Sequence, residues 1–159
     1  MRYKVGYGYD LHRLIKGKKF ILGGVKIDSS FGMKAHSDGD VLLHAVSDAI
    51  LGAVGSGDIG ELFPDTKKEN KDLKSELILK KADSIMRKKG FSICNIDSVL
   101  LLEKPKLSKY KQKIIANMAR ILKINKSKIN LKAKTQEGFG AIGSKRAIAA
   151  FSVVLVERK

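Results

Sequence analysis

The segment at residues 35–45, AHSDGDVLLHA, most constrains the fold because it joins a helix start to two of the three histidines in the chain. Ser37 and Asp38 are favourable N-cap residues, and the apolar residues after them predict a helix that starts near Asp38 and runs to about Val54. Residues four apart share one face of a helix, so this helix would carry a polar stripe of Asp40, His44 and Asp48. Its other face would be apolar and buried. Such a helix can hold a metal or acid–base site, or it can be an ordinary amphipathic helix with a solvated acidic face.

The first predicted strand, residues 2–14, alternates large apolar side chains with small or polar ones. A period of two places every second residue on the same face of a strand. One face therefore carries Gly6, Gly8, Asp10 and His12. The two glycines leave room for something to lie close to the backbone, next to the two polar side chains.

The rest of the chain shows no internal repeat and no domain boundary, so residues 1–159 are expected to form a single domain. The element order favours an α+β fold in which helices pack on one face of a mixed β-sheet, as in a ferredoxin-like sandwich. The further predicted strands are 20–22 and 25–27, joined as a hairpin at Gly23–Gly24, then 91–102, 129–134 and 147–157. Further helices are predicted at 73–89 and 110–122, and loops at 28–34, 55–66 and 135–145, the second of these with a short turn of helix.

The formal net charge of +16 points first to an anionic partner such as nucleic acid. However, the 32 lysine and arginine residues are spread along the chain. Lysine dominates, and arginine, which reads guanine and phosphate bidentately, is scarce. The sequence has no aromatic RNA-binding motif and no zinc-finger pattern. We therefore interpret most of the charge as solvent-facing lysine, which a polyphosphate substrate would also tolerate, and nucleic acid is not favoured as a partner.

A single cysteine, Cys94, cannot form an internal disulfide, and it favours a reducing, cytoplasmic compartment. The N-terminal residues contain no apolar signal-peptide core. The longest apolar runs are too short or too interrupted to span a bilayer, so no membrane partner is expected.

Asp10, His12 and His44 form the strongest candidate site. One carboxylate and two imidazoles, offered by a strand and a helix, are ligands that suit Zn²⁺. Three protein ligands would leave a fourth position open, as in a catalytic zinc site. A single histidine is more often a structural polar residue, and an Asp-x-His pair is common, so the spacing alone leaves both interpretations open.

Five motifs together resemble the 2-C-methyl-D-erythritol 2,4-cyclodiphosphate synthase family, and they cover nearly the whole chain. No single one of them is specific, but their combination in this order is. They are YGYDLHRL at 7–14, LGGV at 22–25, AHSDGDVLLHA at 35–45, GDIGELFPDT at 57–66 and KAKTQEG at 132–138.

The resemblance implies that residues 1–159 are a catalytic domain of the non-mevalonate isoprenoid pathway, a phosphorus–oxygen lyase. The reaction cyclises 4-diphosphocytidyl-2-C-methyl-D-erythritol 2-phosphate: the 2-phosphate attacks the β-phosphorus, CMP leaves, and no protein nucleophile is needed. The resemblance assigns one Zn²⁺ per chain to Asp10, His12 and His44, and a second ion, Mg²⁺ or Mn²⁺, to Glu137. The alternatives kept are a basic nucleic-acid-binding protein and a zinc phosphohydrolase that uses metal-bound hydroxide.

The resemblance also assigns roles to individual residues. His36 and Thr135 would stabilise the transition state, and Ser37 would contact phosphate. Asp40 and Asp48 would orient the zinc ligands or shape the helix start. The methylerythritol part would be held by Asp58, Ile59, Gly60, Phe63, Pro64 and Asp65. The cytidine pocket would be formed by Pro105, Lys106, Leu107, Ser108 and Ala133, with Lys134 beside the diphosphate.

The family is a three-fold symmetric homotrimer with active sites at subunit interfaces, and the resemblance implies the same assembly here. The chain departs from the family at Ala141 and Ser144, where Phe and Arg are common. Those residues line a central trimer cavity that can hold an isoprenoid diphosphate. The absence of Phe and Arg at these two positions argues against binding of an isoprenoid diphosphate. It does not affect the predicted catalytic residues, all of which are present.

Overall fold

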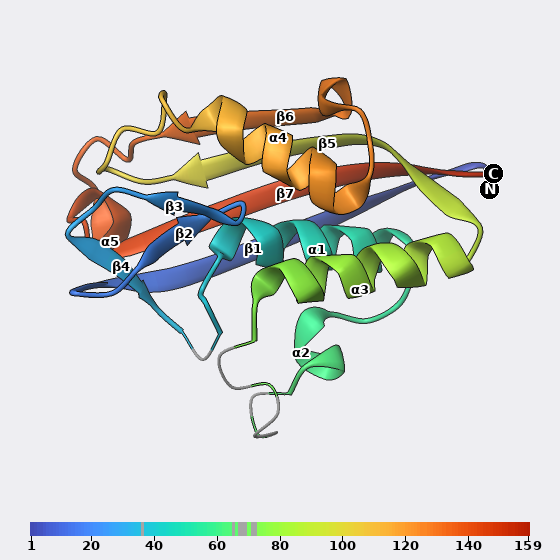
Figure 1. Cartoon of the computed structure of the whole chain (residues 1–159), viewed down its shortest axis with the longest axis horizontal. Coiled ribbons are helices and arrows are strands. Elements are labelled where there is room, and N and C mark those ends of the chain that lie inside the picture. Colours follow the sequence, from blue (N-terminus) through green and yellow to red (C-terminus); the bar gives the residue numbers. More distant parts are fainter. Residues whose placement is uncertain (36, 65, 67–69, 71–72) are drawn as a thin grey trace.

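The computed structural model describes residues 1–35, 37–64, 66, 70 and 73–159. Its centre is one five-stranded sheet (Figure 1). The strands run in the order β4 (Phe31–Lys34), β1 (Tyr3–Lys16), β7 (Ala147–Arg158), β5 (Phe91–Leu101) and β6 (Ile129–Lys134). Neighbours are antiparallel except β5 and β6, which are parallel. The predicted mixed sheet is therefore confirmed.

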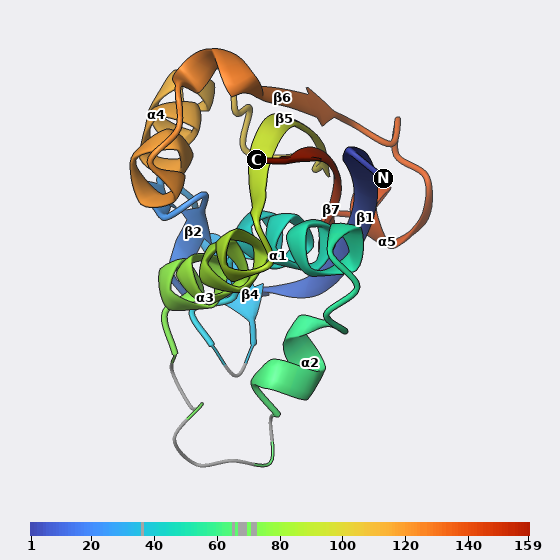
Figure 2. The same cartoon turned by 90° about the vertical axis from the view of Figure 1, so that its right-hand side faces the viewer.

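The three long helices pack on one face of this sheet, as predicted (Figure 2). They are α1 (Val41–Ala53), α3 (Ser75–Lys88) and α4 (Lys111–Leu122). The predicted hairpin forms a separate two-stranded sheet of β2 (Phe20–Leu22) and β3 (Val25–Ile27). The remaining described elements are short: α2 (Ile59–Leu62), the 3-10 helix η2 (Lys126–Lys128) and α5 (Gly140–Gly143). No described helix has the length and apolar character to cross a membrane.

Helix α1 is the centre of the core, and of the two interpretations left open for it, the one with a solvated acidic face is wrong. It packs against β1 and β7 on one side and against α3 on the other. Its buried residues therefore include Leu43, Ser47 and His44 as well as the apolar face predicted from the sequence. The helix also begins at Val41, with Asp40 rather than Asp38 as its N-cap. Since both sides are covered, the Asp40–His44–Asp48 stripe is not a solvated face.

Gly6 and Gly8 allow β1 and α1 to pack with their backbones almost in contact. A Cβ atom at Gly6 would lie 1.8 Å from the Ala49 carbonyl oxygen, and one at Gly8 would lie 1.9 Å from the Ala45 carbonyl oxygen. The room that the two glycines leave on this strand face is thus filled by α1 itself. This packing brings the polar residues at the next two positions of the same face, Asp10 and His12, up to the start of α1.

Two predicted loops contain regular structure. Residues 31–34 form β4, which pairs with the end of β1 and extends that strand to Lys16, beyond the predicted end at Leu14. Residues 140–143 form α5, with Gly140 in the left-handed region at φ 66°. Both elements are four residues long, and pairing or packing with distant segments stabilises them, so local periodicity did not indicate them. The short helix predicted within 55–66 is present as α2.

The sheet face opposite α1, which we call the outer face, exposes large apolar side chains. Ile142 of α5 packs over one end of it, against Ala147 and Ala149. Elsewhere on this face the side chains of β1 and β7 keep exposed fractions between 43% and 65%. They are Tyr3, Val5, Tyr7, Tyr9, Leu11 and Val153. A contiguous apolar surface of this kind is typical of an interaction site.

Candidate functional site

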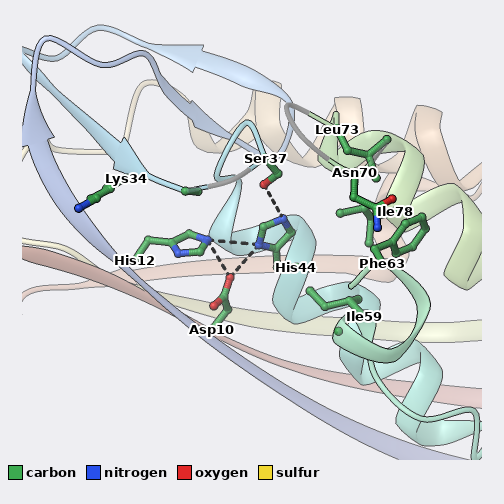
Figure 3. Close-up of a pocket in the computed structure, with 12 residues that line it drawn as sticks. Asp10, His12, Lys34, Ser37, His44, Ile59, Phe63, Asn70, Leu73 and Ile78 are labelled. Carbon is green, nitrogen blue, oxygen red and sulfur yellow. Dashed lines mark hydrogen bonds and ion pairs between the residues drawn. The ribbon is translucent and has the colours of Figure 1, made fainter. Parts of the chain in front are cut away.

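The structure brings Asp10, His12 and His44 together as the sequence predicted (Figure 3). Asp10 and His12 project from β1, and His44 projects from the first turns of α1. The Asp10 Oδ2 atom lies 2.9 Å from His44 Nδ1 and 3.1 Å from His12 Nε2. The two imidazole nitrogens are 3.3 Å apart. One donor atom from each residue thus points to a common position.

The charges of these groups are strongly coupled. Burial alone would raise the pKa of Asp10, but hydrogen bonds and charge from His12 and His44 hold the pKa of this carboxyl far below its usual range. Burial alone would lower the pKa of His44, but the Asp10 carboxylate raises it above the usual value for histidine. The Asp10 carboxylate thus stabilises the protonated form of His44. A metal must displace a proton from His44 Nδ1, and that competition extends to higher pH because the pKa is raised.

The donor set fits a divalent metal ion. All three donor atoms lie within 4.8 Å of one another, and His44 is 6% exposed while Asp10 and His12 are half-buried. Two imidazole nitrogens and one carboxylate oxygen match the preferences of zinc. The partly exposed side of the group leaves access for a further ligand.

A cavity of about 320 Å³ opens beside the three donors. Ser37, Ile59, Gly60 and Phe63, which the family resemblance predicted to bind substrate, line this cavity. Figure 3 shows Ile59 and Phe63 beside His44 and Ser37 above it. His36 and Asp65, predicted to take part in transition-state stabilisation and substrate binding, lie outside the described residues. The cavity also contains residues that the sequence did not single out: Lys34, Ala35, Asn70, Leu73 and Ile78.

Asp58 and Pro64 do not line this cavity. Asp58 is exposed and caps α2, because its carboxylate accepts a hydrogen bond from the Glu61 N–H at 2.9 Å. Pro64 is half-buried, and its carbonyl oxygen accepts a hydrogen bond from the Asn70 side-chain amide at 2.9 Å. These contacts hold the shape of the segment that carries Ile59, Gly60 and Phe63.

A second cavity, of about 200 Å³, lies at the ends of β5 and β6. It gathers the residues that the resemblance assigned to cytidine and diphosphate, together with Thr135. They are Pro105, Lys106, Leu107, Ser108, Ala133, Lys134 and Thr135. Leu102, Glu103 and Lys111 complete the lining. Within the part of the chain that the structure describes, no residue lines both this cavity and the one at the three donors.

The loop after β6 is held against this second cavity. The Gln136 N–H donates to the Glu103 carboxylate at 2.6 Å, and the Thr135 hydroxyl donates to the Glu137 carboxylate. Glu137 has a left-handed backbone with φ 49°. It is exposed and is not part of the Asp10–His12–His44 group. Glu137 thus contacts a residue that lines the second cavity and lies outside the three-donor group of the same chain.

Asp40 and Asp48 tie the scaffold around the site together. Asp40 is fully buried, and its carboxylate accepts the N–H groups of Gly23, Gly24 and Leu43 at 3.0, 2.6 and 3.2 Å. Burial raises the pKa of this carboxyl to about 6 against the opposing effect of those three donors. Asp48 accepts the Ile59 N–H at 2.8 Å, which attaches α2 to α1. Burial raises the pKa of Asp48 as well.

Comparisons with known proteins give one consistent result. The YgbB family model matches residues 3–157. A Fusobacterium nucleatum protein named 2-C-methyl-D-erythritol 2,4-cyclodiphosphate synthase is 48% identical over 156 residues, 98% of each chain. A Treponema denticola protein of the same name is 50% identical, over 96% of this chain and 95% of the other.

Two solved structures share the fold. A Plasmodium falciparum structure described as an IspF CDP complex has a TM-score of 0.88 and 38% identity, over 99% of this chain and 97% of the other. The bifunctional IspDF of Campylobacter jejuni has a TM-score of 0.95 and 43% identity. The match covers 99% of this chain and 42% of that larger one. The resemblance inferred from the five motifs is confirmed, and the chain belongs to the YgbB family.

Proposed function

We propose that this chain catalyses the ring closure of 4-diphosphocytidyl-2-C-methyl-D-erythritol 2-phosphate, which gives the cyclic 2,4-diphosphate and CMP. The single observation that carries this proposal is the Asp10–His12–His44 group beside a cavity lined by Ile59, Gly60 and Phe63. Full-length relatives named for the cyclodiphosphate synthase support it. The Plasmodium falciparum relative described as a CDP complex supports a cytidyl substrate.

The reaction needs positioning and charge stabilisation, because its nucleophile is a phosphate of the substrate itself. When bound, a divalent ion held by Asp10, His12 and His44 would supply Lewis-acid polarisation of a phosphate oxygen. Ile59 and Phe63 offer an apolar wall for the methylerythritol part. Ser37 offers a hydroxyl to a phosphate oxygen.

The second cavity suits the cytidine diphosphate part of the substrate. Its lining combines the buried Leu107 with exposed lysines, of which Lys106 and Lys134 stand beside the loop that carries Thr135. The lysines would neutralise phosphate charge, and Thr135 would donate a hydrogen bond to phosphate in the transition state. His36, outside the described residues, is proposed for the same role.

Because the two cavities share no described residue, we propose that a complete site combines the metal group of one subunit with the cytidine cavity of another. The outer face supplies the surface for such an assembly, since its exposed aromatic and aliphatic side chains would be buried between subunits. Sedimentation analysis measures this directly. A species of three chains is expected, and a stable monomer would contradict the shared site.

Glu137 is proposed as the protein ligand of a second divalent ion, Mg²⁺ or Mn²⁺, which carboxylate and phosphate oxygens suit. Glu137→Gln is expected to raise the Mg²⁺ concentration needed for half-maximal turnover by about tenfold, because an amide oxygen is a weaker ligand than a carboxylate. Zinc content is expected to stay unchanged, since Glu137 is not part of the three-donor group. A metal titration of turnover that is identical to wild type would reject this role.

The proposed activity is tested by incubating the purified chain with the diphosphocytidyl substrate, zinc and magnesium. Phosphorus NMR is expected to show a cyclic diphosphate, with one CMP released for each ring formed. A zinc phosphohydrolase would give a linear phosphate product instead. Detection of only linear products, or no CMP, would overturn the proposal.

A further inference from the structure

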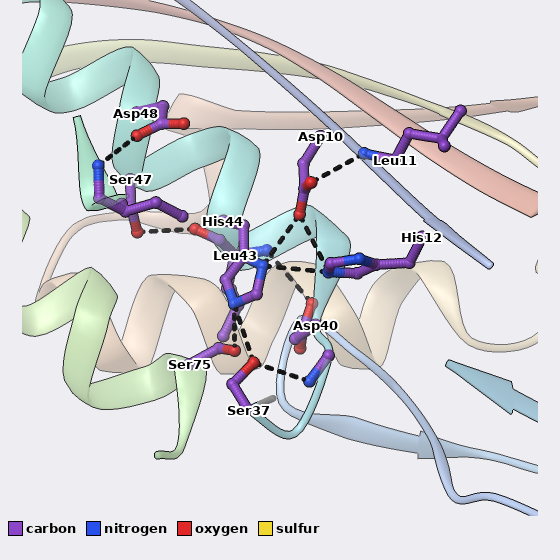
Figure 4. Close-up of polar contacts among 12 residues, drawn as sticks. Asp10, Leu11, His12, Ser37, Asp40, Leu43, His44, Ser47, Asp48 and Ser75 are labelled. Atoms are coloured by element: carbon purple, nitrogen blue, oxygen red, sulfur yellow. Dashed lines mark hydrogen bonds and ion pairs between the residues drawn. The ribbon is translucent and has the colours of Figure 1, made fainter. Parts of the chain in front are cut away.

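Ser75, the first residue of α3, contacts the side of His44 that faces away from Asp10 (Figure 4). Its Oγ atom lies 2.8 Å from His44 Nε2. The same Oγ also contacts the carboxylate of Asp38. Ser75 is completely buried, so water does not compete for these contacts. Ser75 therefore links the helix start of α3 to the imidazole on α1.

The chemistry of the three groups determines the direction of these hydrogen bonds. An ionised carboxylate can only accept, so the Ser75 hydroxyl donates its single proton to Asp38. Ser75 Oγ must then act as the acceptor at His44, and His44 Nε2 must carry a proton and donate it. The Nε2–H therefore anchors one edge of the ring on Ser75. The opposite edge carries Nδ1, which points to Asp10 and His12 and loses its proton when a metal binds.

Asp38 also anchors the helix that carries Ser75. Its carboxylate oxygens accept the Ser75 N–H, each at 3.2 Å. The Asp38 N–H in turn donates to the Leu73 carbonyl at 3.3 Å. Lys74, the N-cap of α3, makes no side-chain capping bond, so Asp38 supplies that contact from a distant segment. Both the position and the proton of Ser75 are thus fixed by Asp38.

Ser37 is the other hydroxyl near His44 Nε2. Its Oγ is 3.4 Å away, which is long for a hydrogen bond, and it accepts the Gly39 N–H at 3.0 Å. No contact between Ser37 and a carboxylate is found among the described residues. Ser37 can therefore rotate its proton in either direction, whereas Ser75 cannot. Of the two serines, Ser75 therefore makes the contact that fixes the orientation of the His44 ring.

We propose that Ser75 and Asp38 are positioning residues that hold the His44 ring by its Nε2–H, so that Nδ1 faces the metal position. This inference rests on the metal site in the proposed function, but it concerns metal affinity rather than the reaction. Contacts that orient a metal-binding histidine commonly change metal affinity by about 10–100-fold.

Zinc affinity, measured by competition with a chromophoric chelator, is the first test. Ser75→Ala is expected to weaken zinc binding by about 10–100-fold, because the His44 Nε2–H loses its acceptor. Ser47→Ala is the matched control. Ser47 is an equally buried serine on α1, and its hydroxyl donates to the Leu43 carbonyl at 2.6 Å without touching His44. This control is expected to keep the zinc affinity of the wild type within about twofold.

The Nε2 proton of His44 itself is the second test. Nitrogen-15 NMR of histidine-labelled, zinc-loaded protein reports whether the His44 Nε2–H is held in a buried hydrogen bond, because such a proton exchanges slowly with water. The chain has only three histidines, so the signals are resolvable. The wild type is expected to show a slowly exchanging His44 Nε2–H signal. Asp38→Asn keeps the side-chain shape but can donate to Ser75, so the hydroxyl is no longer a fixed acceptor and the Nε2–H is expected to exchange faster.

Two outcomes would overturn the inference. One is wild-type zinc affinity and an unchanged Nε2–H signal in both Ser75→Ala and Asp38→Asn. The other is weaker zinc binding with the exchange of the Nε2–H signal unchanged, which would show that the two residues act only on the fold. If the Ser75→Ala protein does not fold, Asp38→Asn still tests the inference. Since neither readout uses the substrate, wild-type zinc binding without cyclisation would reject the proposed function and leave this inference intact.

Discussion

Replacing His44 by alanine is expected to abolish zinc binding and to lower turnover by at least about 10³-fold. The change removes one of three donors, and Lewis-acid stabilisation of several kcal/mol corresponds to that factor at about 1.4 kcal/mol for each tenfold. The fold is expected to remain, since the helix keeps the apolar residues that pack against β1, β7 and α3. Zinc content by mass spectrometry, product formation by phosphorus NMR and far-ultraviolet circular dichroism measure the three effects.

The control for this substitution is again Ser47→Ala, which removes a buried polar group from the same helix without touching the donors. It is expected to retain both zinc and turnover. Turnover at the wild-type rate in a zinc-free His44→Ala preparation would show that the three-donor group is not the reaction centre.

Replacing Gly8 by alanine is expected to lower the free energy of unfolding by at least about 3 kcal/mol, or to prevent folding. The added Cβ would lie 1.9 Å from the Ala45 carbonyl oxygen and 2.8 Å from the Ala49 amide nitrogen. Both atoms belong to the backbone of α1, which is enclosed by the sheet and α3 and cannot move alone. Any protein that does fold must displace α1 from β1, which separates His44 from Asp10, so zinc affinity is expected to fall as well.

Gly52→Ala is the matched control, since Gly52 lies in α1 and is exposed. A Cβ at Gly52 would have no neighbour closer than the Tyr7 carbonyl oxygen at 3.9 Å. Alanine favours a helix over glycine by up to about 1 kcal/mol, so this variant is expected to be as stable as the wild type or slightly more so. Urea unfolding monitored by circular dichroism measures both variants. A Gly8→Ala protein within about 1 kcal/mol of wild type would contradict the close packing of β1 on α1.

Much of the site could be predicted from short-range patterns. The period of a strand placed Gly6, Gly8, Asp10 and His12 on one face, and that face is the one that meets α1. The predicted helix ends near Val54 and at residue 89 lie next to Gly55 and Gly90, whose backbones take positive φ at 59° and 79°. These features depend on neighbours within a few residues, which is the range over which a sequence pattern carries physical information.

Other features could not be predicted because their partners are distant in the sequence. The pattern of α1 left a solvated acidic face open as one of two interpretations, yet α3 covers the side of the helix that faces away from the sheet. Strand β4 has only four residues, and it exists because it pairs with the end of β1. The contact of Ser75 with His44 joins residues 31 positions apart, and a serine at a helix start carries no local sign of such a role.

The sequence by itself determined the ligand types, the strand face that carries two of them and the family of the chain. These depend on residue identity and on spacing along one element. Only the tertiary structure decided how the donors meet, because the 2.9 Å contact between Asp10 and His44 requires two glycines, a helix and a strand to pack without a gap. It also decided which nitrogen of His44 faces the metal position, since that depends on a serine and a carboxylate from elsewhere in the chain.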